Sequence, residues 1–139
     1  MDTYQPVLFE KKDVATAKDY LTMIPTAARV LHHVVAMASP DDRAWHAYGI
    51  SDPTGFAAMG VVEVSVHTYD LALGFGGAFT PLDTPSEFAI NRLFKDTVET
   101  NPQFKSEPAG KQLLWYAGRI PLAGLERRQG WKWNGVVRN

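Results

Sequence analysis

Residues 52–77 read DPTGFAAMGVVEVSVHTYDLALGFGG and carry the clearest structural signal of the chain. Asp52 suits the N-cap of a helix, Pro53 suits the first helical position, and Gly74, Gly76 and Gly77 are typical of a helix end. Between these signals lie about 22 residues, enough for roughly 33 Å of helix. Because this segment is apolar on nearly every side, it predicts a helix over 53–75 that is buried in the core.

Two charged residues and a histidine interrupt this apolar helix. Glu63 and Asp70 are its charged residues, and His67 lies between them. At about 100° per residue, the three share one narrow stripe that is expected to point into the fold. A buried carboxylate is costly without a cation, a donor or a metal ion. Glu63 and His67, four residues apart, can ligate one ion, and Asp70 can orient a ligand or a bound water.

The same stripe has a second interpretation, which involves no metal. Glu63 and His67 could form a buried hydrogen-bonded pair, with Arg29 or Arg119 nearby as the counterion. In that case the chain would be a non-catalytic helical binding or assembly module, and spacing alone does not decide between the two hypotheses.

Composition narrows the classes of protein that fit. The 139 residues suit one domain, and the formal net charge of −1 argues against a partner of nucleic acid or anionic membrane. The chain has no cysteine, so disulfides, thiolate zinc sites and a cysteine nucleophile are excluded, and any thiol chemistry must use an external thiol. Glu63, His67 and Asp70 would be costly in lipid, so we expect no membrane span and a cytoplasmic protein.

The rest of the chain predicts a single all-α domain, a small helical bundle. Apolar residues recur at helical spacing, and capping signals mark the ends of each segment. Asp13 is the expected cap of the first helix, Pro25 is expected to kink that helix or to start a second one, and Thr84–Glu87 resembles a capping box. The expected elements are an extended lead-in over 1–12, helices over 13–38, 53–75, 85–100 and 107–120, and an irregular tail over 121–139 with a short extended piece at 131–133.

The stripe also carries a family resemblance. Residues 63–74, EVSVHTYDLALG, resemble the E-x-x-x-H-x-x-D-x-x-x-G stretch of the mycothiol-dependent maleylpyruvate isomerase-like proteins of actinobacteria, within the DinB-like four-helix-bundle superfamily. The segments WHAYG at 45–49, GFAAMG at 55–60 and WKW at 131–133 are similar too. The likeness covers about residues 14–134.

The resemblance implies a bundle that binds a divalent metal, usually zinc, through two histidines and a glutamate. Glu63 and His67 match two ligand positions, and Asp70 matches the acidic position after them. The implied partners are an external low-molecular-weight thiol such as mycothiol and an electrophilic small molecule, and the implied activity is isomerisation or thiol transfer. A divalent ion can hold a thiol as its thiolate at neutral pH.

The chain departs from the family in one respect. The family's third ligand is a histidine on a helix upstream of the motif, and this chain resembles a member that lacks that N-terminal part. His46, His32 and His33 are the remaining candidates, although each also suits a packing or surface role. Because His32 and His33 are adjacent, they point about 100° apart, so at most one of them faces the core. A second chain in a homo-oligomer could also complete the site.

Basic residues gather near the C-terminus. A solvated tail explains most of them, and Arg119, which closes the last predicted helix, is the candidate for holding a carboxylate of the substrate or thiol. Tryptophans lie beside these charges, but without a recognisable motif we expect no nucleic-acid binding.

Overall fold

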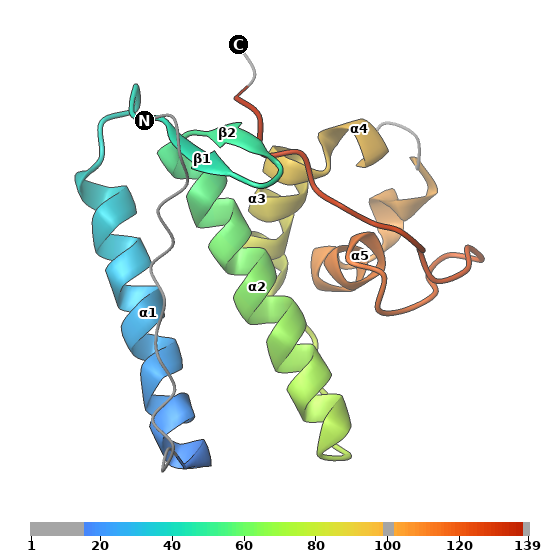
Figure 1. Ribbon diagram of the computed structural model, residues 1–139. Helices are drawn as coiled ribbons and strands as arrows, with labels where there is room; N and C mark the ends of the chain where they lie inside the picture. The colour runs from blue at the N-terminus through green and yellow to red at the C-terminus, as the bar shows by residue number, and fades with distance from the viewer. Residues whose placement is uncertain (1–15, 99–101, 138–139) are drawn as a thin grey trace.

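The computed structural model describes residues 16–98 and 102–137, and these residues are mostly helical (Figure 1). A small two-stranded sheet, which the prediction of an all-α domain did not include, joins the helices. The elements in chain order are α1 (Ala17–Met37), β1 (Ala44–His46), β2 (Gly49–Ser51), α2 (Pro53–Gly74), α3 (Asp83–Leu93), α4 (Lys95–Val98), the 3-10 turn η1 (Pro102–Ser106) and α5 (Ala109–Tyr116).

The hairpin lies between the helices expected over 13–38 and 53–75, in a segment for which the sequence predicts no helix or strand. β1 and β2 pair antiparallel, with Trp45 opposite Ile50 and His46 opposite Gly49. Gly49 has a φ of 111°, which a residue with a side chain rarely adopts. The Nδ1 atom of His46 accepts a hydrogen bond from the Tyr48 backbone N–H at 3.1 Å and stabilises the turn. Alternation over three residues per strand is too short to reveal a hairpin in the sequence.

The ends of α2 follow the sequence signals. The Asp52 side chain accepts a hydrogen bond from the Gly55 backbone N–H at 2.6 Å, and Pro53 occupies the first turn. At the other end Gly76 has a φ of 72°. Its N–H donates to the Leu73 carbonyl, and the Gly77 N–H donates to the Ala72 carbonyl, which is the Schellman arrangement. Both predicted ends are therefore confirmed.

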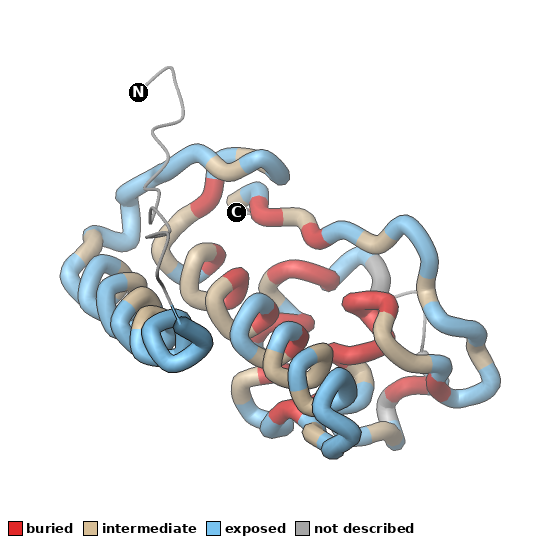
Figure 2. Tube along the Cα trace, turned by 60° about the horizontal axis from the view of Figure 1, so that its bottom comes forward, coloured by how far each residue is buried: buried red, intermediate tan, exposed pale blue. Residues whose placement is uncertain are grey.

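The prediction that α2 is buried on all sides is wrong. One side of the helix is buried, through Gly55, Ala58, Met59, Val62 and Val66. The opposite side carries large apolar residues that are half exposed, such as Val64 and Leu71. Figure 2 shows the buried segments on the side of α2 that faces α3, α5 and the C-terminal tail. Although the helix carries apolar residues on every side, it is not buried on every side, because the other described residues pack against only part of its surface.

The core lies between α2, α3 and α5 and is rich in aromatic rings. Phe94 stacks on Tyr116 with centroids 5.3 Å apart, and Phe104 meets Trp115 edge-on at 4.6 Å. Trp133 of the C-terminal tail is also buried, and the Asn134 N–H donates to the Leu93 carbonyl. The tail predicted as irregular therefore closes the core, and the extended piece expected at 131–133 forms no strand.

Helix α1 stands apart from this core. It packs against α2, yet none of its residues is buried (Figures 1 and 2). Thr16 and Asp19 form a capping box at its start, whereas the predicted cap Asp13 and the lead-in lie outside the described residues. Pro25 lies inside one continuous helix, so it does not start a second one.

Three other predicted boundaries need correction. Helix α3 begins at Asp83 with no side-chain cap, so the capping box at Thr84–Glu87 is wrong. The Asp83 carboxylate instead accepts a hydrogen bond from the Gly110 backbone N–H at 2.8 Å, at the start of α5. The helix expected over 85–100 is interrupted at Phe94, and α5 is shorter than the expected 107–120. Within the described residues, no helix combines the length and apolar character that crossing a bilayer requires.

Candidate functional site

The polar stripe of α2 is assembled as the spacing predicts, but it faces outward. Glu63 Oε2 lies 3.1 Å from His67 Nε2, and Asp70 Oδ2 lies 3.5 Å from His67 Nδ1. Their side chains are 53%, 63% and 39% exposed, so the prediction that they point into the core is wrong. The inner side of the helix is taken by Val62 and Val66. The penalty for a buried carboxylate therefore does not apply to Glu63.

Arg119 anchors one end of the stripe. Its Nε donates to Asp70 Oδ1 at 3.2 Å and its Nη2 donates to Asp70 Oδ2 at 2.7 Å. A third hydrogen bond joins Nη1 to the Ala117 carbonyl, and the guanidinium lies over the Trp131 ring at 5.4 Å. The hydrogen bonds from Arg119 hold the pKa of Asp70 below its usual range, so this carboxylate is charged at neutral pH. The guanidinium expected to hold a substrate is thus occupied by Asp70.

This geometry orients the imidazole of His67. Its Nδ1 lies 3.5 Å from Asp70 Oδ2 and its Nε2 lies 3.1 Å from Glu63 Oε2, so each ring nitrogen faces a carboxylate. A divalent ion bound at Nε2 would replace a proton there and leave the Nδ1–H to donate to Asp70. A ligating histidine in metal sites usually donates its other N–H to a carboxylate in this way. Glu63 and His67 thus lie close enough together for both to contact one divalent ion, and Asp70 lies where a group that orients His67 would lie.

The stripe borders a groove of about 460 Å³ between α1 and α2. Most of its lining is apolar, and Gly60 allows a close approach of the two helices, because a Cβ there would lie 2.6 Å from Leu31 Cδ2. Glu63 and His67 are its polar groups on α2, together with Thr68. The other lining residues are Ile24, Ala27, Ala28 and Leu31 of α1, Phe56, Met59, Gly60, Val64 and Leu71 of α2, and His46 and Trp133.

Of the three other candidate histidines, only His46 reaches this groove. Its Nδ1 accepts the Tyr48 N–H, so a neutral ring carries its proton on Nε2 and donates rather than ligates. His32 lines a different groove, on the other flank of α1. His33, the next residue in the chain, is exposed. Among residues 16–98 and 102–137, no three His, Asp or Glu side chains are grouped so that they could hold one metal ion.

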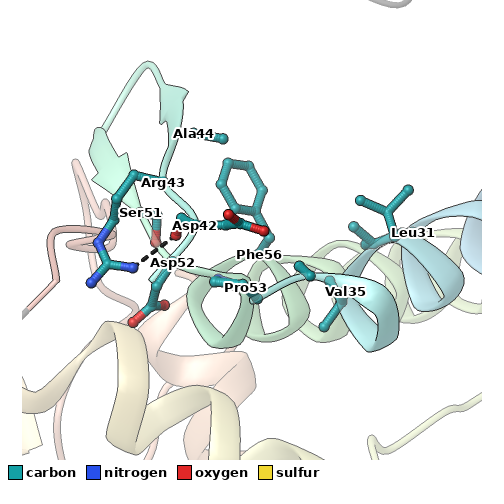
Figure 3. Close-up of a pocket in the computed structure, with 11 residues that line it drawn as sticks. Leu31, Val35, Asp42, Arg43, Ala44, Ser51, Asp52, Pro53 and Phe56 are labelled. Carbon is teal, nitrogen blue, oxygen red and sulfur yellow. Dashed lines mark hydrogen bonds between the residues drawn. The ribbon is translucent and has the colours of Figure 1, made fainter. Parts of the chain in front are cut away.

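A smaller hollow of about 270 Å³ lies near the C-terminal end of α1 (Figure 3). Leu31 and Val35 of α1 line it from one side, and Pro53 and Phe56 of α2 line it from another. The Arg43 side chain beside it donates to the carbonyls of Pro40 and Asp42, both at 2.8 Å. The lining of this hollow is mainly apolar and contains no histidine, so the hollow offers space for an apolar group but no metal-ligating imidazole.

Sequence reasoning missed the cluster that positions the far end of the groove. Arg92 Nη2 donates to Asp52 Oδ1 at 2.9 Å, to Ser51 Oγ at 3.3 Å and to the Gly135 carbonyl at 3.2 Å. This cluster ties α3 to the hairpin and the tail, and so places His46 and Trp133 beside the groove. The contacts join residues 40 or more positions apart, so no local pattern in the sequence signals them.

The structure thus defines a mostly helical protein with a Glu–His–Asp stripe at the edge of an apolar groove. Comparison with known proteins assigns it no relative, since no family model, curated protein or solved structure matches the chain.

Proposed function

We propose that this chain binds a divalent metal ion, zinc foremost, through Glu63 and His67. The observation that carries the proposal is the chain of contacts from Arg119 to Asp70, from Asp70 to His67 Nδ1, and from His67 Nε2 to Glu63. It leaves an imidazole nitrogen and a carboxylate oxygen 3.1 Å apart on successive helical turns, close enough to share one ion.

The proposed activity is thiol-dependent isomerisation or thiol transfer on an electrophilic small molecule. A divalent ion would supply the low thiol pKa that keeps an external thiol such as mycothiol as thiolate at neutral pH. In an isomerisation, the thiolate sulfur adds to one carbon of an activated double bond. The resulting single bond rotates, and loss of the same sulfur restores the double bond and the thiolate. The apolar groove offers a place for the carbon skeleton, and the resemblance to the mycothiol-dependent proteins supports the choice of thiol.

Metal content tests the first part of the proposal. Chelator-treated protein reconstituted with zinc should retain about one ion per chain, and Glu63→Gln and His67→Ala should lose it. Because both side chains are more than half exposed, these variants should keep their stability within about 0.5 kcal/mol, so loss of metal cannot be attributed to unfolding. Glu87→Gln, at an exposed position on α3, is the matched control and should bind zinc as the parent does.

Thiol binding tests the second part. In the cobalt-substituted protein, addition of mycothiol should produce a thiolate-to-cobalt charge-transfer absorption, and His67→Ala should abolish it. Cobalt uptake without this absorption would contradict the thiol-dependent activity but leave the metal site.

The alternative is a non-catalytic helical binding or assembly module. One observation favours it: Asp70 and His67 already have partners within the chain, so the stripe forms a complete polar network without an ion. If zinc does not bind and Glu63→Gln behaves as the parent does, this alternative holds.

A further inference from the structure

The flank of α1 and α2 that carries the groove is a large apolar surface. Val30 and Val34 lie three and seven residues after Ala27, a groove residue, so they continue the same side of α1. Val30 is 55% exposed, Val34 is 61% exposed and Leu71 of α2 is 51% exposed. We call the surface formed by Ile24, Ala27, Val30, Val34, Glu63, His67 and Leu71 the groove face.

The size of the groove face suits an interface between two proteins. Helix α1 has 21 residues and α2 has 22, so each is about 32 Å long. Two packed helices present a face about 20 Å wide, or roughly 600 Å², near the 800 Å² or so that each partner buries in a standard interface. Exposed apolar surfaces that carry polar residues at their edges often mark interaction sites.

The Glu63–His67 turn lies near the middle of this face and supplies two ligands, whereas catalytic zinc sites usually have three from protein. In a two-fold interface a patch packs on itself, and residues near the centre of the patch lie close to the axis and meet their own copies. If a second copy packs on the groove face, the Glu63–His67 turns of the two copies therefore meet. His46 and Trp133 close the groove at the end where Phe56 and Met59 lie. A second copy would therefore contact the open part of the groove, where His67 lies, and the two-fold axis would pass through that part.

We propose that this chain forms a two-fold dimer through the groove face, which makes a four-helix bundle from α1 and α2 of each copy. Each ion then takes Glu63 and His67 of one copy and the partner's Glu63 as its third ligand. Paired carboxylates from facing helices hold metals in this way in other bundles. The inference rests on the proposed metal binding, and it also predicts that the two Glu63 carboxylates repel each other when no cation lies between them.

The experiment is light scattering coupled to size exclusion, with zinc and with chelator. The parent chain should be a dimer with one zinc per chain, and chelation should weaken the dimer about tenfold or more, since an ion bound only by the dimer stabilises it. Val30→Glu should give a folded monomer with much weaker zinc binding, although Glu63 and His67 are intact. Val34→Glu provides a second exposed position. Ala36→Glu, on the opposite side of α1, is the control and should remain a zinc-binding dimer.

Glu63→Gln separates the two proposals. It removes both the ligand and the repulsion, so it should dimerise without zinc and fail to bind zinc. A parent chain that binds one zinc as a monomer overturns the dimer and leaves the metal site. A zinc-loaded dimer that tolerates both Val30→Glu and Val34→Glu overturns the groove face as the interface. A parent chain that takes up no zinc overturns the proposed function and the shared ligands together.

Discussion

Arg119 holds the carboxylate of Asp70 in a two-pronged ion pair, with Nη2 to Oδ2 at 2.7 Å and Nε to Oδ1 at 3.2 Å. The two residues are 49 positions apart, and their contact fastens the chain that follows α5 to the outer face of α2. Because Asp70 Oδ2, the oxygen that accepts from Arg119 Nη2, also lies 3.5 Å from His67 Nδ1, the same contact orients the imidazole. One ion pair thus serves both the packing of the tail and the geometry of the candidate site.

Removal of this ion pair should affect stability and zinc binding together. Arg119→Ala should lower the free energy of unfolding by about 1 kcal/mol, because the pair has two hydrogen bonds but is partly exposed. It should also weaken zinc binding about tenfold, as is usual when the group that orients a ligating histidine is lost. Urea unfolding and zinc titration measure the two effects. Lys111→Ala, at an exposed position on α5, should change neither, and unchanged zinc affinity in Arg119→Ala would contradict the orienting role.

Asp52 should make the protein sensitive to acid. Burial raises its pKa, but hydrogen bonds from Arg92, Gly55 and Thr54 outweigh burial, so the pKa lies below its ordinary value of 3.8. A carboxyl whose pKa is lower in the folded state stabilises the fold above about pH 4, and this contribution is lost as the pH falls through the folded-state pKa.

The Asp52→Asn variant tests this dependence, since asparagine still caps the helix but does not titrate. Its free energy of unfolding should be lower than the parent's at pH 7 and should change less between pH 5 and pH 2, values chosen to span the carboxyl range. Asp41→Asn, in the exposed loop after α1, should follow the parent's pH profile. Equal acid profiles for the parent and Asp52→Asn would refute the assignment.

Tyr116 should make the protein sensitive to alkali. Burial in the aromatic core raises its pKa to about 12, compared with 10.0 for an ordinary tyrosine. The unfolded chain therefore ionises this phenol first, and stability should fall as the pH rises above about 10. Tyr116→Phe should flatten that decline in thermal unfolding measured across the alkaline range, whereas Tyr48→Phe, at a half-exposed position, should leave it unchanged.

Gly110 is needed where α5 approaches the loop before α3. A Cβ at this position would lie 2.0 Å from the Pro81 carbonyl oxygen, and backbone cannot move aside as a flexible side chain can. Gly110→Ala should therefore destabilise the protein by about 3 kcal/mol, at the upper end of overpacking effects. Gly74→Ala is the matched control, because no atom lies within 4 Å of its Cβ, and it should be neutral or stabilise α2 by up to about 1 kcal/mol. Chemical denaturation of both variants measures the difference, and similar losses in the two would contradict the steric explanation.

Features that depend on neighbouring residues could be predicted from the amino-acid sequence. The ends of α2 follow from Asp52, Pro53 and the closing glycines, because capping hydrogen bonds span only a few positions. The grouping of Glu63, His67 and Asp70 also follows from helical spacing, which places residues three and four apart on one side whatever surrounds the helix.

The direction in which that stripe faces and the residues that it contacts depend on how the helices pack. The apolar composition of α2 indicates that the helix has surface to bury, but it does not indicate how many other elements pack against that surface. In the folded protein one side of α2 is buried and the opposite side is half exposed. The pairing of Asp70 with Arg119, the ties from Arg92 to the hairpin and tail, and the entry of His46 into the groove all join distant parts of the chain. Such contacts depend on how the elements pack in space, and no periodicity along a single strand or helix records them.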